Sequence, residues 1–150
     1  ERLCLIETNI DNMNPELYEA VLERLFAAGA LDAYLTPIIM KKSRPGVVLS
    51  ALCNPEDRED IVRAIFEETS TLGIRIADIE RRCLQREFKE VETPFGKLKF
   101  KIAYLEGEAI SASPEYEDCK KIAQKHKVST RRVYDAAKAA AQRILTHKDS

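Results

Sequence analysis

The tripeptide Asn-Pro-Glu occurs twice in the chain, each time directly after an apolar segment that is typical of a strand. Asn14-Pro15-Glu16 follows the segment 2–10, and Asn54-Pro55-Glu56 follows the segment 47–53. Asparagine favours the cap position of a helix, proline suits the first turn, and an early acid interacts well with the helix dipole. Each copy therefore predicts the start of a helix, and the repeat indicates two similar halves.

The segments between and after these helix starts complete the pattern. Apolar residues recur at helical spacing after each start, further strands are predicted at 32–42 and 74–80, and a turn is predicted at 44–46. The predicted order is strand, helix, strand, strand, helix, strand. That order is typical of a ferredoxin-like βαββαβ sandwich of the α+β class, here spanning residues 1–86.

The rest of the chain has a different pattern. Segments 88–93 and 97–105 alternate as strands around Pro94-Phe95-Gly96, which predicts a small β-hairpin. Ser113-Pro114-Glu115 then predicts the start of one helix, and Ser129 or Thr130 is expected to cap a last helix that runs through Leu145. We therefore expect a β-hairpin and two-helix subdomain at residues 87–150.

Composition limits the class of protein. With 45% hydrophobic and 33% charged residues, 150 residues can bury a real core. The net charge of −1 hides a split, because residues 1–40 carry seven acids and two bases whereas residues 119–150 carry nine bases and two acids. The four cysteines show no CxxC spacing, which predicts reduced thiols in the cytoplasm, and no apolar stretch approaches the roughly 20 residues that span a bilayer.

Oxygen-bearing side chains alternate along the end of the first predicted strand, at Glu7, Asn9 and Asp11. Side chains of a strand alternate between its two faces, so these three are expected together on the open face of the sheet, with Arg75 of the fourth strand. Such oxygen ligands suit Mg²⁺ or Mn²⁺ bound together with phosphate oxygens. A solvated or subunit-facing salt-bridge surface is the alternative.

Two cationic clusters could bind phosphate. Lys41, Lys42 and Arg44 surround a flexible turn, a density of charge that is common in polyphosphate sites but also ordinary at hairpin tips. Arg81 belongs to a second cluster just past the fourth strand, for which an ion-pair network between domains or subunits is the alternative. The chain has neither a GxGxxG motif nor a Walker-type phosphate loop, so a bound nucleotide would occupy an unusual site.

Two other classes of function stay open. Residues 120–144 have the helix, short turn, helix layout and basic character of a helix-turn-helix, so a ferredoxin-like regulator with a DNA-binding tail is one alternative. The break between these helices contains no glycine, and the Ala-rich segment 136–141 suits close helix packing better than entry into a DNA groove. An oligomerisation module without a ligand of its own is the other alternative.

Long strings in the chain resemble the C-terminal domain of the nickel-insertion protein of the lactate racemase cofactor pathway. They occur in the same order over essentially the whole chain: ETNIDNMNPE (7–16), YLTPIIMKKSRPG (34–46), TLGIRIADIERRCLQRE (71–87), VETPFGKLKFK (91–101) and SPEYEDC (113–119). Asn12 departs from the family's pattern, which usually has Asp there. If that carboxylate contacts metal, the resemblance implies a weaker metal affinity for this chain.

The resemblance implies a CTP-dependent nickel cyclometallase. In that family, the full-length protein inserts its substrate metal, nickel, into pyridinium-3,5-bisthiocarboxylic acid mononucleotide while CTP is cleaved to CMP and diphosphate. The C-terminal domain binds CTP with Mg²⁺ or Mn²⁺ and assembles into a homo-oligomer, expected to be a hexamer. The chain would then be a fragment that works with an N-terminal domain of the same protein, and neither a membrane nor nucleic acid is expected as a partner.

The resemblance also suggests roles for the candidate residues. Glu7 and Asp11 are expected to anchor the divalent ion directly or through water, while Asn9 and Asn14 orient ligands. The side chains expected to neutralise the triphosphate are Lys41, Lys42, Arg44 and Arg75, with Arg81 as a further candidate. No residue is assigned a catalytic role.

Overall fold

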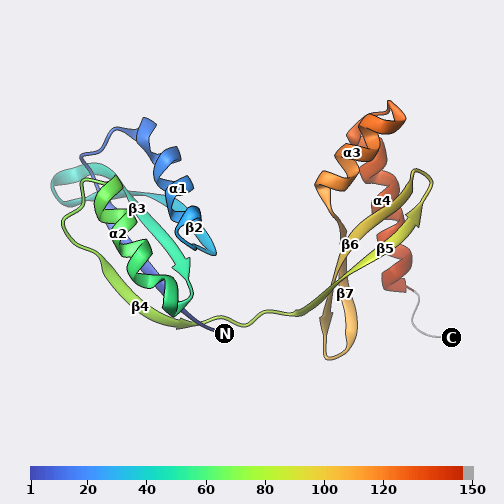
Figure 1. Ribbon diagram of the computed structural model, residues 1–150, viewed down its shortest axis with the longest axis horizontal. Coiled ribbons are helices and arrows are strands. Elements are labelled where there is room, and N and C mark those ends of the chain that lie inside the picture. Colours follow the sequence, from blue (N-terminus) through green and yellow to red (C-terminus); the bar gives the residue numbers. More distant parts are fainter. Residues whose placement is uncertain (147–150) are drawn as a thin grey trace. The chain divides into compact units, whose positions relative to one another are not determined.

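The chain divides into two compact units, unit 1 at Glu1–Arg82 and unit 2 at Cys83–Ser150, each with its own sheet and its own helices. The computed structural model describes residues 1–146 (Figure 1). Each unit also has a separate hydrophobic core, and the two core clusters share no residue. The α+β class predicted from the sequence is confirmed.

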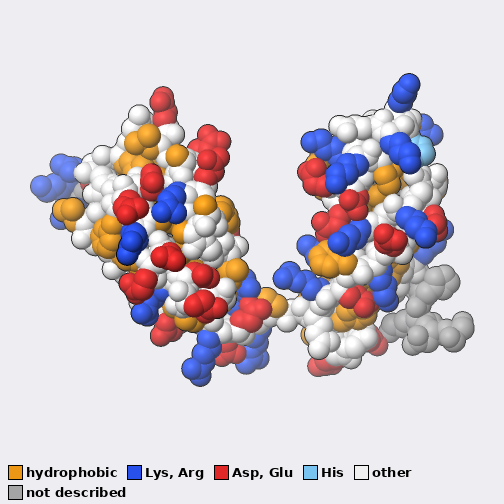
Figure 2. All heavy atoms as spheres, in the orientation of Figure 1, with side chains coloured by type: hydrophobic (Ala, Val, Ile, Leu, Met, Phe, Trp, Pro, Cys, Tyr) orange, Lys and Arg blue, Asp and Glu red, His pale blue; other side chains and the backbone are white. Residues whose placement is uncertain are grey.

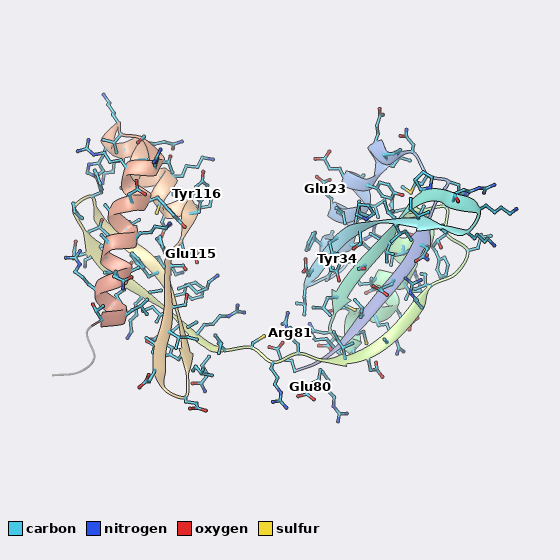
Figure 3. The ribbon with its side chains drawn as sticks, turned by 180° about the vertical axis from the view of Figure 1, so that it is seen from behind. Glu23, Tyr34, Glu80, Arg81, Glu115 and Tyr116 are labelled. Atoms are coloured by element: carbon cyan, nitrogen blue, oxygen red, sulfur yellow. The ribbon has the colours of Figure 1, made fainter. Side chains whose placement is uncertain are left out.

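Unit 1 has the predicted element order. It consists of β1 (Arg2–Ile10), α1 (Tyr18–Ala27), β2 (Asp32–Met40), β3 (Arg44–Cys53), α2 (Arg58–Glu68) and β4 (Arg75–Glu80). The strands form one antiparallel sheet in the order β2-β3-β1-β4, the order that a ferredoxin-like sandwich has. Both helices lie on one face of this sheet, so its other face is open (Figures 1 and 3).

The two Asn-Pro-Glu copies precede the two helices, but only one asparagine caps a backbone group. A 3₁₀ turn at Pro15–Leu17 leads into α1, and the Asn14 side-chain oxygen accepts a hydrogen bond from the Glu16 amide at 3.1 Å. A similar turn at Pro55–Asp57 leads into α2, where the Asn54 side chain makes no such bond. The second helix therefore begins as predicted without its predicted cap.

The predicted turn at residues 44–46 is wrong. Met40 already pairs with Arg44, and the connection between β2 and β3 is the 3₁₀ segment Lys41–Ser43, in which Lys42 and Ser43 have φ angles of 60° and 56°. Pro and Gly at 45 and 46 indicated a turn, yet both lie within β3. Glycine is required there for a different reason, since a Cβ atom at Gly46 would lie 2.7 Å from the Ile10 carbonyl oxygen.

Unit 2 contains the predicted hairpin and one strand more. It consists of β5 (Gln85–Thr93), β6 (Gly96–Leu105), β7 (Glu108–Pro114), α3 (Tyr116–His126) and α4 (Thr130–Thr146), with the sheet order β5-β6-β7. Strand β7 was not predicted from the sequence, because its segment carries few large apolar residues. Ser129 caps α4 as predicted, since its hydroxyl oxygen accepts from the Arg132 amide at 3.3 Å.

The cores contain three of the four cysteines. Cys4 and Cys53 are buried in unit 1 and Cys119 in unit 2, and all four cysteines are free thiols, as predicted. The Ala-rich stretch of α4 supplies Ala137, Ala140 and Ala141 to the core of unit 2. Within residues 1–146, no helix has the length and hydropathy needed to cross a membrane.

Candidate functional site

The alternation of β1 places its polar side chains on the open face of the unit 1 sheet. Ile6, Thr8 and Ile10 are buried, whereas Glu7 and Asn9 between them point to the opposite face. One row of side chains crosses this face, because Tyr34 pairs with Ser50, Ser50 with Glu7, and Glu7 with Arg75 (Figure 3 labels Tyr34). We call these four residues the polar row.

Arg75 joins the carboxylate and amide of β1, as the alternation predicted. Its Nε donates to Glu7 Oε2 at 3.2 Å, and a terminal guanidinium nitrogen donates to Asn9 Oδ1 at 2.8 Å. The buried Ser50 hydroxyl donates to the other oxygen, Glu7 Oε1, at 3.0 Å. Both oxygens of Glu7 are therefore engaged by protein donors, and the arginine, whose side chain is 53% exposed, is held in one orientation.

Asp11 lies just past the end of β1, beside the β2–β3 connection. Its Oδ2 lies 3.7 Å from a terminal nitrogen of Arg44, and the carboxylate side chain is 24% exposed. It borders an open depression of about 310 Å³. The lining residues are Ile10, Asp11, Met13, Pro15, Tyr18, Pro45, Gly46 and Val47.

The tip of this hairpin concentrates positive charge, and Figure 2 shows blue side chains at this end of unit 1. Lys41 and Lys42 occupy the connection itself and Arg44 follows directly. In the described part of the chain, neither lysine forms an ion pair, and Arg44 has Asp11 as its carboxylate partner. Three cations and one carboxylate thus share one end of the sheet, which leaves a local excess of positive charge for an anionic ligand.

The remaining predicted site residues have other partners. The Asn14 oxygen accepts the helix-start bond described above, and Asn12 accepts a hydrogen bond from the Ser70 hydroxyl at 2.6 Å. A terminal guanidinium nitrogen of Arg81 lies 2.6 Å from Glu1 Oε2. This contact stands beside the backbone pair Arg2–Glu80, at the end of β1 opposite to Asp11 (Figure 3). The structure therefore does not bring Arg81 together with the hairpin cations.

Among the residues that the structure describes, no group of three or more His, Cys, Asp and Glu side chains could hold a metal ion. A divalent ion at this end of the sheet would need most of its ligands from water or from a bound molecule. Mg²⁺ is often bound in that way, by one or two carboxylates and by phosphate oxygens. The donor set around Asp11 fits a metal that arrives with a nucleotide better than a permanently held metal.

Two residues of the polar row, Tyr34 and Ser50, were not predicted from the sequence. Both stand at alternating strand positions, which predicts only that they share a face with other residues of their own strand. Their proximity to Glu7 depends on the register of β1, β2 and β3, which the sequence does not encode in a short motif. The available signal in the sequence was a lone serine at position 50, on the same strand face as the apolar Val48 and Leu52.

Comparison with known proteins gives a consistent result. The family model described as nickel insertion protein matches residues 1–134. The chain is 48% identical over 136 residues to the pyridinium-3,5-bisthiocarboxylic acid mononucleotide nickel insertion protein of Clostridium acetobutylicum, covering 91% of this chain and 32% of that protein. It is 49% identical over 140 residues to the protein of the same name from Acetivibrio thermocellus, covering 93% and 34%. The chain thus spans about a third of the length of these curated relatives.

Two solved structures have the same fold. One is LarC2 in its apo form, described as the C-terminal domain of a cyclometallase involved in the synthesis of the NPN cofactor of lactate racemase. It has a TM-score of 0.86 and 37% sequence identity, and the match covers 95% of this chain and 98% of that one. The other is a protein of Methanopyrus kandleri, with a TM-score of 0.69 and 26% identity, covering 93% and 86%.

Proposed function

Because the chain belongs to the nickel insertion protein family, we propose that it is the C-terminal domain of a cytoplasmic nickel insertase and that its unit 1 binds CTP with Mg²⁺ or Mn²⁺. The full-length protein would insert nickel into pyridinium-3,5-bisthiocarboxylic acid mononucleotide while CTP is cleaved to CMP and diphosphate. Nickel is the substrate metal of this reaction. An N-terminal domain of the same protein would contribute to the reaction with this chain.

The observation that carries the nucleotide proposal is the excess of positive charge at the β2–β3 hairpin. Among the described residues, Arg44 is paired with Asp11, whereas Lys41 and Lys42 have no carboxylate partner. A triphosphate with one divalent ion carries about two negative charges, which such a cluster would stabilise through charge-assisted hydrogen bonds. The same cluster would stabilise the charge that develops on a diphosphate leaving group.

The contacts suggest separate roles for the acidic and amide side chains. Asp11 would hold the divalent ion directly or through water, because it borders the depression and its ion-pair partner is 3.7 Å away. Glu7 and Asn9 would act mainly by orienting Arg75 toward the ligand, although Glu7 could also accept a metal-bound water. Asn14 would orient a ligand through its amide nitrogen, and Arg81 would reach this end of the sheet only from a second copy.

Titration calorimetry with CTP, in the presence and absence of Mn²⁺ and with ATP and UTP as controls, tests the proposal. We expect selective binding of CTP that depends on the metal. The variant D11N should bind CTP with a reduced dependence on Mn²⁺. Equal binding of all three nucleotides, or no binding of any, would contradict the proposed CTP site in this domain.

Two cationic variants test the site residues. Lys41→Ala and Arg75→Ala should each weaken CTP binding by about 1.5–3 kcal/mol, the usual loss when a hydrogen bond to a charged group is removed. Arg63→Ala is the matched control, because Arg63 is an exposed cation of α2 that has no recorded ion pair in residues 1–146. Unchanged titrations for Lys41→Ala and Arg75→Ala would remove both side chains from the site.

Exposed apolar side chains on unit 1 favour a homo-oligomer, which we propose to be a hexamer. Leu72 is 98% exposed and Ile39, next to the hairpin tip, is 73% exposed. Covering such side chains with a second copy would be favourable. Sedimentation velocity measures the assembly, and a stable oligomer that binds no nucleotide would support the alternative of a module that only oligomerises.

The packing of α4 argues against the DNA-binding alternative. Ala137, Ala140 and Ala141 are buried in the core of unit 2, so the Ala-rich stretch is used inside the protein. Salt-sensitive binding to random duplex DNA, measured by fluorescence anisotropy, would revive that alternative.

A further inference from the structure

The unit 2 sheet has an open face with a different chemistry from that of unit 1. Leu98, Phe100 and Ile102 of β6 are buried against α3 and α4. The residues that alternate with them therefore project from the opposite face: Lys97, Lys99, Lys101 and Ala103. Figure 1 shows α3 and α4 on the same side of β5, β6 and β7. We call the other side the unit 2 open face.

One end of this face is hollowed around Ala103. In the sheet register, Ala103 lies between Arg86 of β5 and Ser111 of β7, and Lys101 lies beside Ser113. The small methyl group of Ala103 therefore forms a floor between longer side chains. The resulting depression has a volume of about 290 Å³ and is lined by Cys83, Leu84, Arg86, Lys101, Ala103, Ser111 and Ser113.

The two cations and two serine hydroxyls of this depression have no recorded side-chain partner in the described part of the chain. Within residues 1–146, the structure records no ion pair and no side-chain hydrogen bond for Arg86, Lys101, Ser111 or Ser113, although Lys89 on the same β5 strand is paired with Glu87 at 2.8 Å. The acids of this face, Glu90 and Glu92, are in register with Lys99 and Lys97, further along the sheet. Two uncompensated cations and two hydroxyl donors thus surround one small floor.

We propose that this depression binds the phosphomonoester group of a small phosphorylated molecule. The Arg86 guanidinium can donate two parallel hydrogen bonds to a phosphate, Lys101 supplies a second charge, and both serine hydroxyls can donate to the remaining oxygens. Leu84, which is 43% exposed, provides an apolar wall for the body of the molecule. The site lies within unit 2 and uses none of the residues proposed for CTP and the divalent ion.

The surroundings favour a small ligand over a nucleic acid. A polyanion that followed the open face beyond Lys101 would meet Glu90 and Glu92. The depression has a volume of about 290 Å³, close to the lower bound of roughly 300 Å³ for pockets that bind small molecules. Both a mononucleotide and free diphosphate could offer phosphate oxygens to this depression. Of the two, we propose the phosphomonoester of the mononucleotide.

The test uses the 150-residue chain, amide NMR shifts of the unit 2 strands and titration calorimetry. The probes are nicotinic acid mononucleotide, ribose 5-phosphate, inorganic diphosphate and a ten-nucleotide RNA. We expect saturable shifts around Ala103 with the first two probes, and the double variant R86Q/K101Q should weaken their binding at least about tenfold. Lys97→Gln is the matched control, because it removes one charge from the same strand and face outside the depression, and it should change affinity by less than about twofold.

Each contrary result overturns the proposal in a recognisable way. Equal losses of affinity for the phosphomonoester probes in R86Q/K101Q and K97Q would mean that a diffuse positive field attracts them without a defined site. Tighter binding of inorganic diphosphate than of both monoesters would assign the depression to a free anion, and tighter binding of a ten-nucleotide RNA with a steep salt dependence would assign it to nucleic acid. If R86Q/K101Q lost Mn²⁺-CTP binding while Lys41→Ala kept its CTP affinity, the CTP site would lie in unit 2. That result would overturn both the proposed unit 1 site and the separate phosphomonoester site.

Discussion

Gly46 lies in β3, beside the end of β1 and the end of β2. A Cβ atom there would lie 2.7 Å from the Ile10 carbonyl oxygen and 2.7 Å from Met40 Sδ. The methionine can move, but the carbonyl is fixed by the ladder, so Gly46→Ala should lower the free energy of unfolding by about 1–3 kcal/mol. Urea unfolding measures the loss. Gly73→Ala is the control, since no atom lies within 4 Å of its added Cβ, and equal midpoints for the two variants would contradict the prediction.

The buried thiol of Cys53 should make unit 1 less stable in alkali. Burial raises the pKa of Cys53 from 9.0 to about 11. In the unfolded chain this thiol deprotonates near pH 9, so between pH 9 and 11 the native state holds a proton that the unfolded state has lost. The stabilisation by this thiol is therefore complete below pH 9 and declines as pH rises toward 11, by about 1.4 kcal/mol per pH unit.

The variant Cys53→Ala isolates this effect from other groups that titrate in alkali. Its free energy of unfolding, measured by urea unfolding between pH 8 and 11, should fall less steeply with pH than that of the unmodified chain. Cys83→Ala, which alters an exposed cysteine, should keep the original slope. Parallel curves for the unmodified chain and Cys53→Ala would refute the assignment.

The candidate site was predictable from the sequence where one strand supplies its residues. Strand alternation alone placed Glu7 and Asn9 on one face, and Arg75 indeed bonds to both. It did not predict that both Glu7 oxygens are engaged, because the Ser50 hydroxyl comes from a strand far along the chain. The roles proposed for Lys41 and Asp11 in ligand binding stay predictions.

At the scale of elements, local backbone chemistry decided what could be predicted. Asn14 marked the start of a helix because capping depends on neighbouring residues alone. The β2–β3 connection was misplaced because its left-handed residues are Lys42 and Ser43, which have no glycine-like signal. Strand β7 was missed because its ladder with β6, from Phe100 paired with Pro114 to Leu105 paired with Glu108, stabilises a segment of weak intrinsic preference.

The packing of α4 gives a prediction for a whole helix. Ala137 is fully buried and Ala139 is exposed, although they stand two positions apart. Ala137→Leu should overfill the contact between α4 and the unit 2 core and lower the free energy of unfolding by about 1–3 kcal/mol. Ala139→Leu should change it by less than about 0.5 kcal/mol. Thermal unfolding followed by circular dichroism measures both, and equal effects would mean that the buried face of α4 is misassigned.

At the scale of the whole molecule, the separation of the two cores predicts two cooperative units. Ile65 is fully buried in the unit 1 cluster and Phe100 in the unit 2 cluster, and no residue belongs to both. Truncating a buried side chain removes packing that only its own cluster shares, so local stability should fall in one unit at a time.

Hydrogen exchange measured by mass spectrometry checks this independence. Ile65→Ala should speed exchange of the most protected amides in residues 1–82 by about two orders of magnitude, as expected for a loss of roughly 3 kcal/mol, and leave residues 83–146 unchanged. Phe100→Ala should do the reverse. Faster exchange in both units with either variant would mean that the two cores unfold together. The two sites proposed above, for CTP and for a phosphomonoester, would then share one stability.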